Sequence, residues 1–312
     1  MAFTLRREPG RRCAPLDSGA VKPADSSTSV SPQELCEIAC AVAREAADQV
    51  RVRRADLFPA TGRRADDAAV STKSTPTDPV TVADTESERL IRGLLAVVRP
   101  HDAILGEEEG GADALADGVR WVVDPIDGTV NFLYGVPAYA VSVAAQVDGV
   151  SQAGAVVDVA RGVTYWAWLG GGAWCAGPNE EPRRLTANPV DDVALALVAT
   201  GFGYSPIRRR AQGELLAALL PQIRDVRRMG AAALDLCMVA AGAVDAHFEH
   251  GLAPWDWAAG GLIAAEAGAR VVLPPAQSSS ADGHATVAVA PGIADDFLAL
   301  LTDIDGLRQL PE

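Results

Sequence analysis

The chain has 312 residues, 49% of them hydrophobic, so it can bury one large core or two ordinary ones. Its formal net charge of −14 argues against nucleic acid or an anionic membrane surface as the main partner, because both attract basic proteins. The five cysteines are scattered, which predicts reduced thiols in the cytoplasm and no disulfide framework. No apolar run is long enough to span a membrane.

The first part of the chain is predicted to contain a flexible tail, a long helix and a loop. Residues 1–30 are rich in Arg, Pro, Ser and Gly and show no periodicity, so they are expected to be the tail. A helix is expected from Ser31, which has capping-box spacing to Glu34, to about residue 56. The polar segment 59–80 is expected to be an exposed loop.

The next part is predicted to combine one helix with a series of strands. A helix over 84–98 precedes a short strand at 103–105 and a buried strand at 121–123 that ends abruptly in acidic residues. A hairpin over 139–159 and further strands to residue 176 follow. We therefore expect an α+β half over 31–190.

After about residue 190 the signals for strands and helices alternate. Strands are expected at 193–200, 223–228, 243–249, 271–273 and 285–289, and helices at 212–220, 231–241, 256–267 and 293–301. This alternation predicts an α/β half over 191–312.

Acidic residues occur where apolar segments begin or end. Asp124, Asp127 and Glu107 follow expected strands, and Asp84 and Asp256 open expected helices. Each alone can be a helix cap, a solvated loop residue or a turn residue. Strand ends and helix starts nevertheless meet at one rim in α/β architectures, and crowded carboxylates need a cation to neutralise them. Oxygen-only ligands favour Mg²⁺ or Mn²⁺ over zinc, so a magnesium site is predicted.

Five stretches in order resemble the signatures of the inositol monophosphatase family. They are Lys73–Asp84, Gly106–Glu108, Asp124–Phe132 (DPIDGTVNF), Gly230–Asp235 and Trp255–Gly268 (WDWAAGGLIAAEAG). The resemblance covers roughly residues 31–305 and is strongest to the bacterial, actinobacterial SuhB-type enzymes. It implies a layered αβαβα sugar-phosphatase-type fold, with an N-terminal helix pair and antiparallel sheet followed by a C-terminal α/β half. It also implies a homodimer.

The resemblance implies a role for each matching residue. Two or three Mg²⁺ ions, with Mn²⁺ as the alternative, would be held by the side chains of Glu107, Asp124, Asp127 and Asp256 and the carbonyl of Ile126. Thr129, oriented by Asp84, would act with Glu107 on a metal-activated water. The substrate contacts would be Glu107, Ile126, Asp127, Gly128, Thr129, Arg227, Ala232, Glu249 and Asp256. Lys73 and Glu108 are further loop candidates.

The expected reaction is magnesium-dependent hydrolysis of myo-inositol 1-phosphate and related inositol monophosphates. Asn131 and Phe132 after the Gly-Thr pair favour the inositol branch of the superfamily. Fructose 1,6-bisphosphate, histidinol phosphate and 3′-phosphonucleotides stay open as alternative substrates, as does a non-catalytic regulatory binding protein. Phosphate monoesters hydrolyse extremely slowly in water, and metal ions offset the charge repulsion that opposes attack.

The His247–His250 stretch is an alternative metal motif. On a strand His247 and Glu249 share one face, whereas His250 lies on the other. Because no third ligand lies nearby in the sequence, zinc is not expected there.

Overall fold

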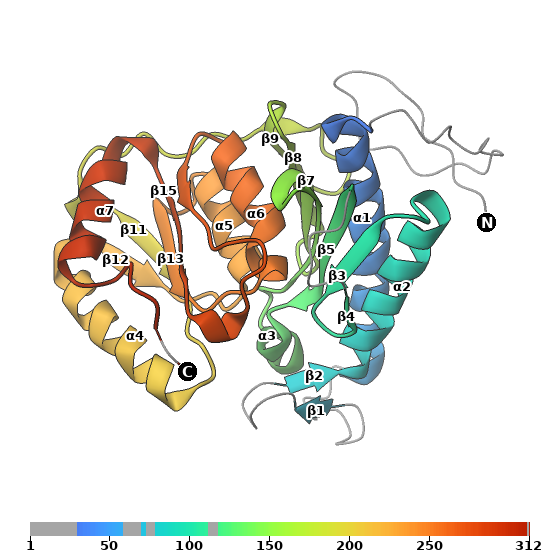
Figure 1. Ribbon diagram of the computed structural model, residues 1–312, viewed down its shortest axis with the longest axis horizontal. Coiled ribbons are helices and arrows are strands. Elements are labelled where there is room, and N and C mark those ends of the chain that lie inside the picture. Colours follow the sequence, from blue (N-terminus) through green and yellow to red (C-terminus); the bar gives the residue numbers. More distant parts are fainter. Residues whose placement is uncertain (1–29, 59–69, 73–78, 112–117, 311) are drawn as a thin grey trace.

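The computed structural model describes residues 30–58, 70–72, 79–111, 118–310 and 312. Their elements form five layers: a helix pair, an eight-stranded sheet, a second helix pair, a five-stranded sheet and a third helix pair (Figure 1). The expected layered αβαβα fold is therefore confirmed. No described helix is long and apolar enough to cross a membrane. The predicted boundary near residue 190 between two halves stays a prediction.

The first layer consists of α1 (Pro32–Leu57) and α2 (Val82–Val98). The start of α1 is the predicted capping box: the Glu34 N–H donates to Ser31 Oγ over 3.3 Å, and the Ser31 N–H donates to Glu34 Oε2 over 3.1 Å. Such a cap stabilises a helix by about 1 kcal/mol. The apolar stripe of α1 packs on the eight-stranded sheet, as its spacing predicted.

The eight-stranded sheet has the order β10-β9-β8-β7-β6-β5-β3-β4 and is antiparallel apart from the β3–β5 pair. Its strands are β3 (Ala103–Gly106), β4 (Gly110–Gly111), β5 (Val119–Asp127), β6 (Ala140–Val147), β7 (Val150–Asp158), β8 (Val163–Trp168), β9 (Gly172–Ala176) and β10 (Arg183–Arg184). Strand β6 and the part of β7 from Ala153 onward are buried, because α1 covers one face of the sheet and α6 covers the other. The predicted hairpin over 139–159 is this β6–β7 pair.

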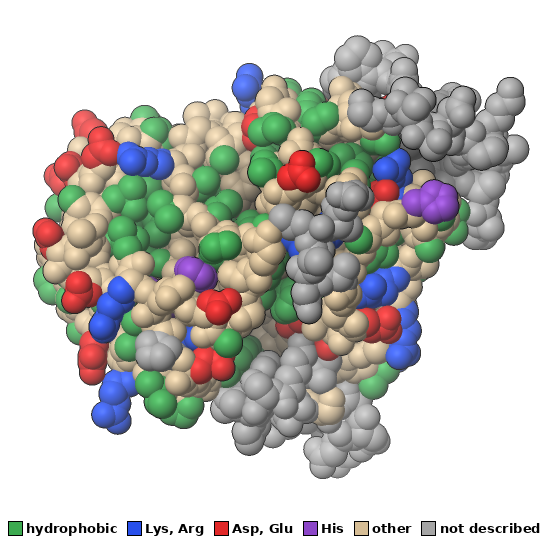
Figure 2. Space-filling view, in the orientation of Figure 1, with side chains coloured by type: hydrophobic (Ala, Val, Ile, Leu, Met, Phe, Trp, Pro, Cys, Tyr) green, Lys and Arg blue, Asp and Glu red, His purple; other side chains and the backbone are tan. Residues whose placement is uncertain are grey.

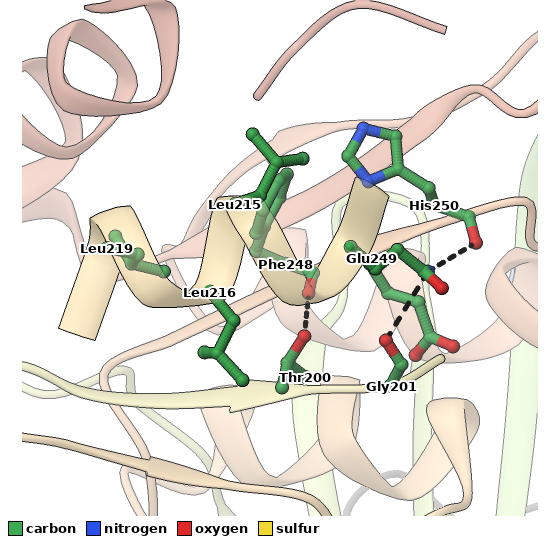
Figure 3. A pocket seen from close by; sticks show the side chains of 9 residues that line it. Thr200, Gly201, Leu215, Leu216, Leu219, Phe248, Glu249 and His250 are labelled. Atoms are coloured by element: carbon green, nitrogen blue, oxygen red, sulfur yellow. Dashed lines mark hydrogen bonds between the residues drawn. The ribbon is translucent and has the colours of Figure 1, made fainter. Parts of the chain in front are cut away.

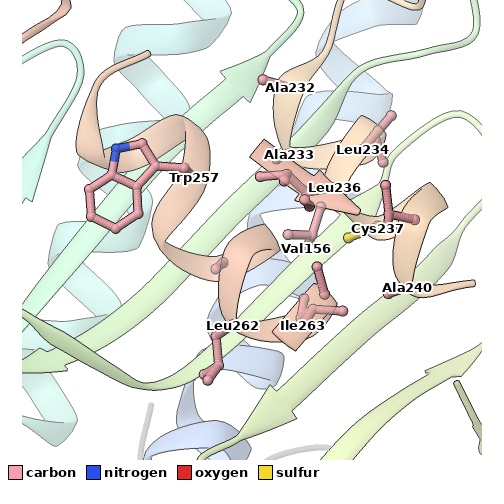
Figure 4. Close-up of a cluster of buried hydrophobic side chains, with 14 of the residues drawn as sticks. Val156, Ala232, Ala233, Leu234, Leu236, Cys237, Ala240, Trp257, Leu262 and Ile263 are labelled. Carbon is pink, nitrogen blue, oxygen red and sulfur yellow. The ribbon is translucent and has the colours of Figure 1, made fainter. Parts of the chain in front are cut away.

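The middle layer consists of α5 (Ala232–Ala240) and α6 (Pro254–Glu266), which lie between the two sheets. Leu236 of α5 and Ile263 of α6 are fully buried in one apolar cluster with Val156 of β7 (Figure 4). A helix buried on both sides must be apolar on both sides, which explains the weak amphipathic pattern of these two segments. The cluster fixes the helix starts that carry Asp256 and Ala232 against the first sheet.

The five-stranded sheet has the order β12-β11-β13-β15-β14, with β11 parallel to β12 and β13 and the other pairs antiparallel. Its strands are β11 (Leu197–Thr200), β12 (Asp225–Arg227), β13 (Ala246–His250), β14 (Arg270–Val272) and β15 (Ala285–Val289). The outer helices α4 (Pro206–Leu219) and α7 (Ala294–Asp303) close a third apolar cluster with Phe248 and Phe297.

Part of the expected loop over 59–80 is ordered as strand. β1 (Val70–Thr72) and β2 (Pro79–Thr81) pair antiparallel, so the loop prediction is wrong for these residues. The predicted tail, apart from Val30, and Lys73 lie outside the described residues. The four described cysteines are free and buried, in line with the absence of a disulfide framework.

In the second half of the chain, some helices and strands begin at other residues than the sequence predicts, and prolines and a capping side chain explain the differences. The helix expected from residue 212 begins at Pro206, and the one expected from 256 begins at Pro254, because proline favours the first helical turn. The strand expected from 193 begins at Leu197, because the Asp192 side chain caps a 3-10 turn by accepting the Ala194 N–H over 2.9 Å.

Candidate active site

Strand β5 carries two acidic residues on the same side through a β-bulge. Residues three apart on a regular strand point to opposite faces. Between Asp124, opposite Ser142, and Asp127, opposite Ala140, three steps on β5 match two on β6. The extra residue turns Asp127 to the side of Asp124. The strand therefore continues through Asp127, where the sequence predicted an end before Asp124.

Asp124, Asp127 and Asp256 converge, each offering an oxygen within 4.8 Å of the others. Asp256 comes from the first turn of α6, where its Oδ2 accepts the Ala253 N–H over 2.7 Å. Burial raises the pKa of Asp124 and Asp256 well above the ordinary value, and the negative charge of Glu107 raises both further. A divalent cation would relieve this repulsion, and an all-oxygen donor set fits Mg²⁺.

Asp127 is also tied to the start of α5. Its two carboxylate oxygens accept the Ala232 N–H over 3.2 Å and the Ala233 N–H over 2.8 Å. Burial raises the pKa of Asp127 to about 7, although these backbone hydrogen bonds lower it. The Ala232 N–H, a predicted substrate contact, thus donates to Asp127, and its role toward substrate stays a prediction.

Glu107 follows β3 directly and begins a loop beside β5. Its N–H donates to the Val123 carbonyl over 3.3 Å, which continues the parallel pairing of β3 and β5. Glu107 is also hydrogen-bonded through its side chain to Asp124. The structure therefore brings Glu107 together with the β5 carboxylates, although it lies on a different segment.

The Glu107 loop is fixed by Glu88, a fully buried residue of α2. Glu88 Oε2 accepts the Glu108 N–H over 2.8 Å, and Oε1 accepts the Glu109 N–H over 3.0 Å. Arg92, which donates to Oε1 over 2.8 Å, balances the buried charge. A Cβ at position 106 would collide with the Glu88 carboxylate, so Gly106 allows this close approach.

Glu88 was missed in the sequence, although a signal was present. It lies on the buried stripe of α2 with Asp84, Ile91 and Leu95. A carboxylate in an apolar stripe indicates a buried partner, because an unpaired buried charge is costly.

Thr129 opens the short helix α3 (Thr129–Tyr134) next to Asp84. Its Oγ1 lies 3.1 Å from Asp84 Oδ1 and 3.1 Å from the Ile126 carbonyl oxygen. The other Asp84 oxygen accepts the Thr81 N–H over 2.9 Å. Gly128, before α3, has a φ of 86°, a left-handed conformation that favours glycine. The structure thus brings Thr129, Asp84 and Ile126 into contact at the end of β5.

Glu249 of β13 adjoins the carboxylate group. Burial raises its pKa to about 8, which the positive charge of Arg228 opposes and the negative charge of Asp127 reinforces. Arg227, the predicted substrate contact, instead donates to Asp225 over 2.6 Å at the surface. Arg228 was missed, although strand alternation indicates that neighbouring arginines point to opposite sides.

A small cavity lies on the other side of Glu249, between α4 and strands β11 and β13 (Figure 3). It has a volume of about 10 Å³ and is closed in part by the hydrogen bond from Thr200 Oγ1 to the Phe248 carbonyl, 2.7 Å long. This space is about that of one water molecule, so it is no substrate pocket.

Known proteins and solved structures resemble this chain over most of its length. The model of the inositol monophosphatase family matches residues 31–302. The chain is 55% identical over 286 residues to inositol-1-monophosphatase SuhB of Mycobacterium tuberculosis, covering 90% of this chain and 98% of that protein. It is 39% identical over 237 residues to the Nus factor SuhB of Pasteurella multocida, covering 75% and 86%. A solved structure of Mycobacterium tuberculosis SuhB superposes with a TM-score of 0.75 at 50% identity, covering 89% and 99%.

Proposed function

The chain belongs to the inositol monophosphatase family and is a phosphatase, and from this premise we propose that it hydrolyses inositol monophosphates with the help of Mg²⁺. The observation that carries the proposal is the convergence of Asp124, Asp127 and Asp256 within 4.8 Å of one another. Glu107 and the Ile126 carbonyl are the proposed further ligands. Mn²⁺ shares these oxygen preferences and is the alternative ion.

The catalytic roles follow from the contacts of Thr129. Bound divalent ions neutralise the phosphoryl oxygens, lower the pKa of a water molecule and stabilise the departing alkoxide. The Thr129 hydroxyl donates a hydrogen bond to Asp84 Oδ1 over 3.1 Å, so the Thr129 oxygen is oriented to accept a hydrogen bond from the attacking water. Glu107, held in place through its loop, accepts the proton of that water. Orientation of the water before attack lowers the entropic part of the barrier.

The proposed substrate orientation places the phosphate at α3 and the alcohol near Glu249. Backbone N–H groups of Gly128 and Thr129 contact the phosphate oxygens. Glu249 accepts hydrogen bonds from the ring hydroxyls, and the positive charge of Arg228 opposes the burial that raises the pKa of this carboxyl to about 8. Myo-inositol 1-phosphate is the proposed preferred ester, because it offers both a phosphate and adjacent hydroxyls.

The test is phosphate release from a panel of esters in the presence of Mg²⁺. The panel contains myo-inositol 1-phosphate, fructose 1,6-bisphosphate, histidinol phosphate and a 3′-phosphonucleotide, ranked by kcat/KM. We expect the inositol ester to rank first. A rank far below the others would overturn the substrate assignment while leaving the phosphatase activity in place.

Two variants test the metal site separately. Asp124→Asn is expected to lower Mg²⁺-dependent turnover on the order of 1,000-fold, because it removes several kcal/mol of charge stabilisation. The matched control is Asp148→Asn, in the exposed β6–β7 turn, and it is expected to keep full activity. Undiminished turnover in Asp124→Asn would refute the metal mechanism.

A regulatory binding role is the second candidate, because three relatives are named Nus factor SuhB. The intact carboxylate group favours catalysis instead. Basic and acidic side chains are interspersed over the face in Figure 2, which agrees with the acidic net charge in disfavouring nucleic acid as the main partner. Absence of Mg²⁺-dependent phosphate release from every ester of the panel would favour the regulatory role.

We also propose a cytoplasmic homodimer, carried over from the family resemblance. Sedimentation at micromolar concentration tests the assembly, and a particle of twice the chain mass is expected. A monomer at every concentration would refute it.

A further inference from the structure

A second group of metal-ligating side chains lies beside the carboxylate site. Asp235 from α5 and His247 and Glu249 from β13 each offer a ligand atom within 4.8 Å of the others. His247 Nδ1 lies 3.9 Å from Asp235 Oδ2, and His247 Nε2 lies 4.0 Å from Glu249 Oε2. His247 and Glu249 are two residues apart on β13, so both point to the face that α5 covers.

Asp235 and His247 are buried without hydrogen-bond partners. Their exposed fractions are 1% and 0%, and neither carboxylate oxygen and neither ring nitrogen has a partner. Buried polar groups in native proteins are nearly always paired, and leaving one unpaired costs about 1–3 kcal/mol. Four such atoms on two adjacent residues therefore indicate a ligand that binds between them.

Burial disfavours the charged form of each of these three side chains. Burial raises the pKa of Asp235 well above its ordinary value, raises that of Glu249 to about 8, and lowers that of His247 to about 3. Arg228 lowers the pKa of both carboxyls through its charge, but it forms no hydrogen bond with either Asp235 oxygen. A divalent cation would neutralise both carboxylates and use the neutral imidazole as a donor.

We propose that Asp235, His247 and Glu249 bind a divalent transition-metal ion of the zinc class. This site is separate from the magnesium carboxylates and shares Glu249 with the proposed position of the substrate alcohol. The imidazole nitrogen favours zinc-like ions, whereas Mg²⁺ prefers an all-oxygen shell. Zinc at its usual bond lengths holds tetrahedral ligand atoms roughly 3.3 Å apart. One ring nitrogen of His247 and one oxygen each of Asp235 and Glu249 lie within 4.8 Å of one another, so the side chains must close on the ion from that distance. The Glu249 side chain is 11% exposed, whereas the side chains of Asp235 and His247 are almost completely buried.

From the sequence alone, zinc is not expected at this motif, because no third ligand lies near His247 and Glu249 along the chain. The structure supplies it from the preceding helix, since α5 packs on β13. His250, the other histidine of the motif, faces away and contacts the Arg308 carbonyl oxygen over 3.1 Å. The ligand set is therefore a property of the tertiary structure and involves only one of the two histidines.

The test is direct metal binding by the full chain, stripped with a chelator and then kept in millimolar Mg²⁺ to fill the carboxylate site. Zn²⁺ is titrated against a chromophoric competitor, and one tightly bound equivalent is expected. His247→Phe keeps an aromatic ring and removes no hydrogen bond, and it is expected to weaken zinc binding roughly 100-fold or more. Unchanged zinc affinity in this variant would overturn the proposal.

Two controls separate this site from other zinc binding. His101→Gln removes an exposed histidine and is expected to leave the zinc affinity unchanged. Asp124→Asn disables the proposed magnesium site and is also expected to retain the zinc equivalent. Zinc binding lost in Asp124→Asn but kept in His247→Phe would assign the ion to the magnesium carboxylates and overturn the proposal.

X-ray absorption at the zinc edge uses the unmodified protein, so its result does not depend on whether a variant folds. With one equivalent of Zn²⁺ in excess Mg²⁺, we expect one imidazole nitrogen among oxygen donors. A shell of oxygens alone would overturn the proposal. Neither measurement uses turnover, so the result is independent of whether the proposed phosphatase substrate is correct.

Discussion

Asp127→Asn should stabilise the metal-free protein at high pH, although it disables the proposed magnesium site. Burial raises the pKa of Asp127 from 3.8 to about 7, so between these values the folded protein binds a proton that the unfolded chain releases. The stability of the metal-free protein therefore falls as the pH rises through this range. The side-chain amide that Asp127→Asn introduces cannot ionise, so the variant does not lose stability in this way as the pH rises.

The size of the effect follows from the two pKa values. The ionisation of Asp127 costs about 1.7 kcal/mol at pH 5 and about 4 kcal/mol at pH 8, using 1.36 kcal/mol per pKa unit. The stability difference between variant and parent should thus grow by about 2–3 kcal/mol, or on the order of 5–10 °C in Tm. The amide also disturbs a hydrogen bond from Ala232 or Ala233, which subtracts about 1 kcal/mol at every pH.

The assay is urea unfolding of both proteins in EDTA at pH 5 and pH 8, repeated with Mg²⁺. His247 and His250 also titrate differently on unfolding, but both proteins share these groups, so their effect cancels in the difference. With Mg²⁺ at pH 8 the parent should gain more stability than the variant, because the ion binds the folded carboxylates. A stability difference that is the same at pH 5 and pH 8 in EDTA would refute this reasoning.

Three further predictions concern the neighbours of the carboxylates. Thr129→Val should lower kcat on the order of 100-fold while leaving the Mg²⁺ affinity unchanged, because only the oriented hydroxyl is lost. A variant with the kcat of the parent would exclude a role of Thr129 in orienting the water. Glu88→Gln should destabilise the fold by about 3 kcal/mol in urea unfolding and weaken Mg²⁺ binding, because the Glu107 loop loses a buried charged anchor; parental stability would contradict this. Arg228→Ala should raise KM on the order of tenfold, because Glu249 loses the positive charge that lowers its pKa, whereas Arg227→Ala should leave KM unchanged. The reverse ranking would contradict the assignment.

Local signals in the sequence determined most of the elements. The capping box at Ser31 and Glu34 and the apolar stripe of α1 predicted that helix, because both depend on contacts within a few residues. The alternation and turn of the β6–β7 hairpin are local in the same sense. Family signatures singled out the carboxylates, and they also indicated the layered fold that the structure shows.

Contacts between distant segments decided the arrangement of the site. Asp124 and Asp127 share a side because β5 bulges against β6, and a count of residues along β5 alone predicts opposite faces. Glu88 anchors the loop after β3 only because α2 packs beside that loop.

The sequence by itself thus determined most of the local elements and singled out the candidate site residues, because helix, strand and turn preferences and short motifs depend on neighbouring residues. Only the tertiary structure decided which side chains meet. It brings Asp235 close to His247 and the charge of Arg228 close to Glu249, because burial and packing bring together groups that no local pattern relates.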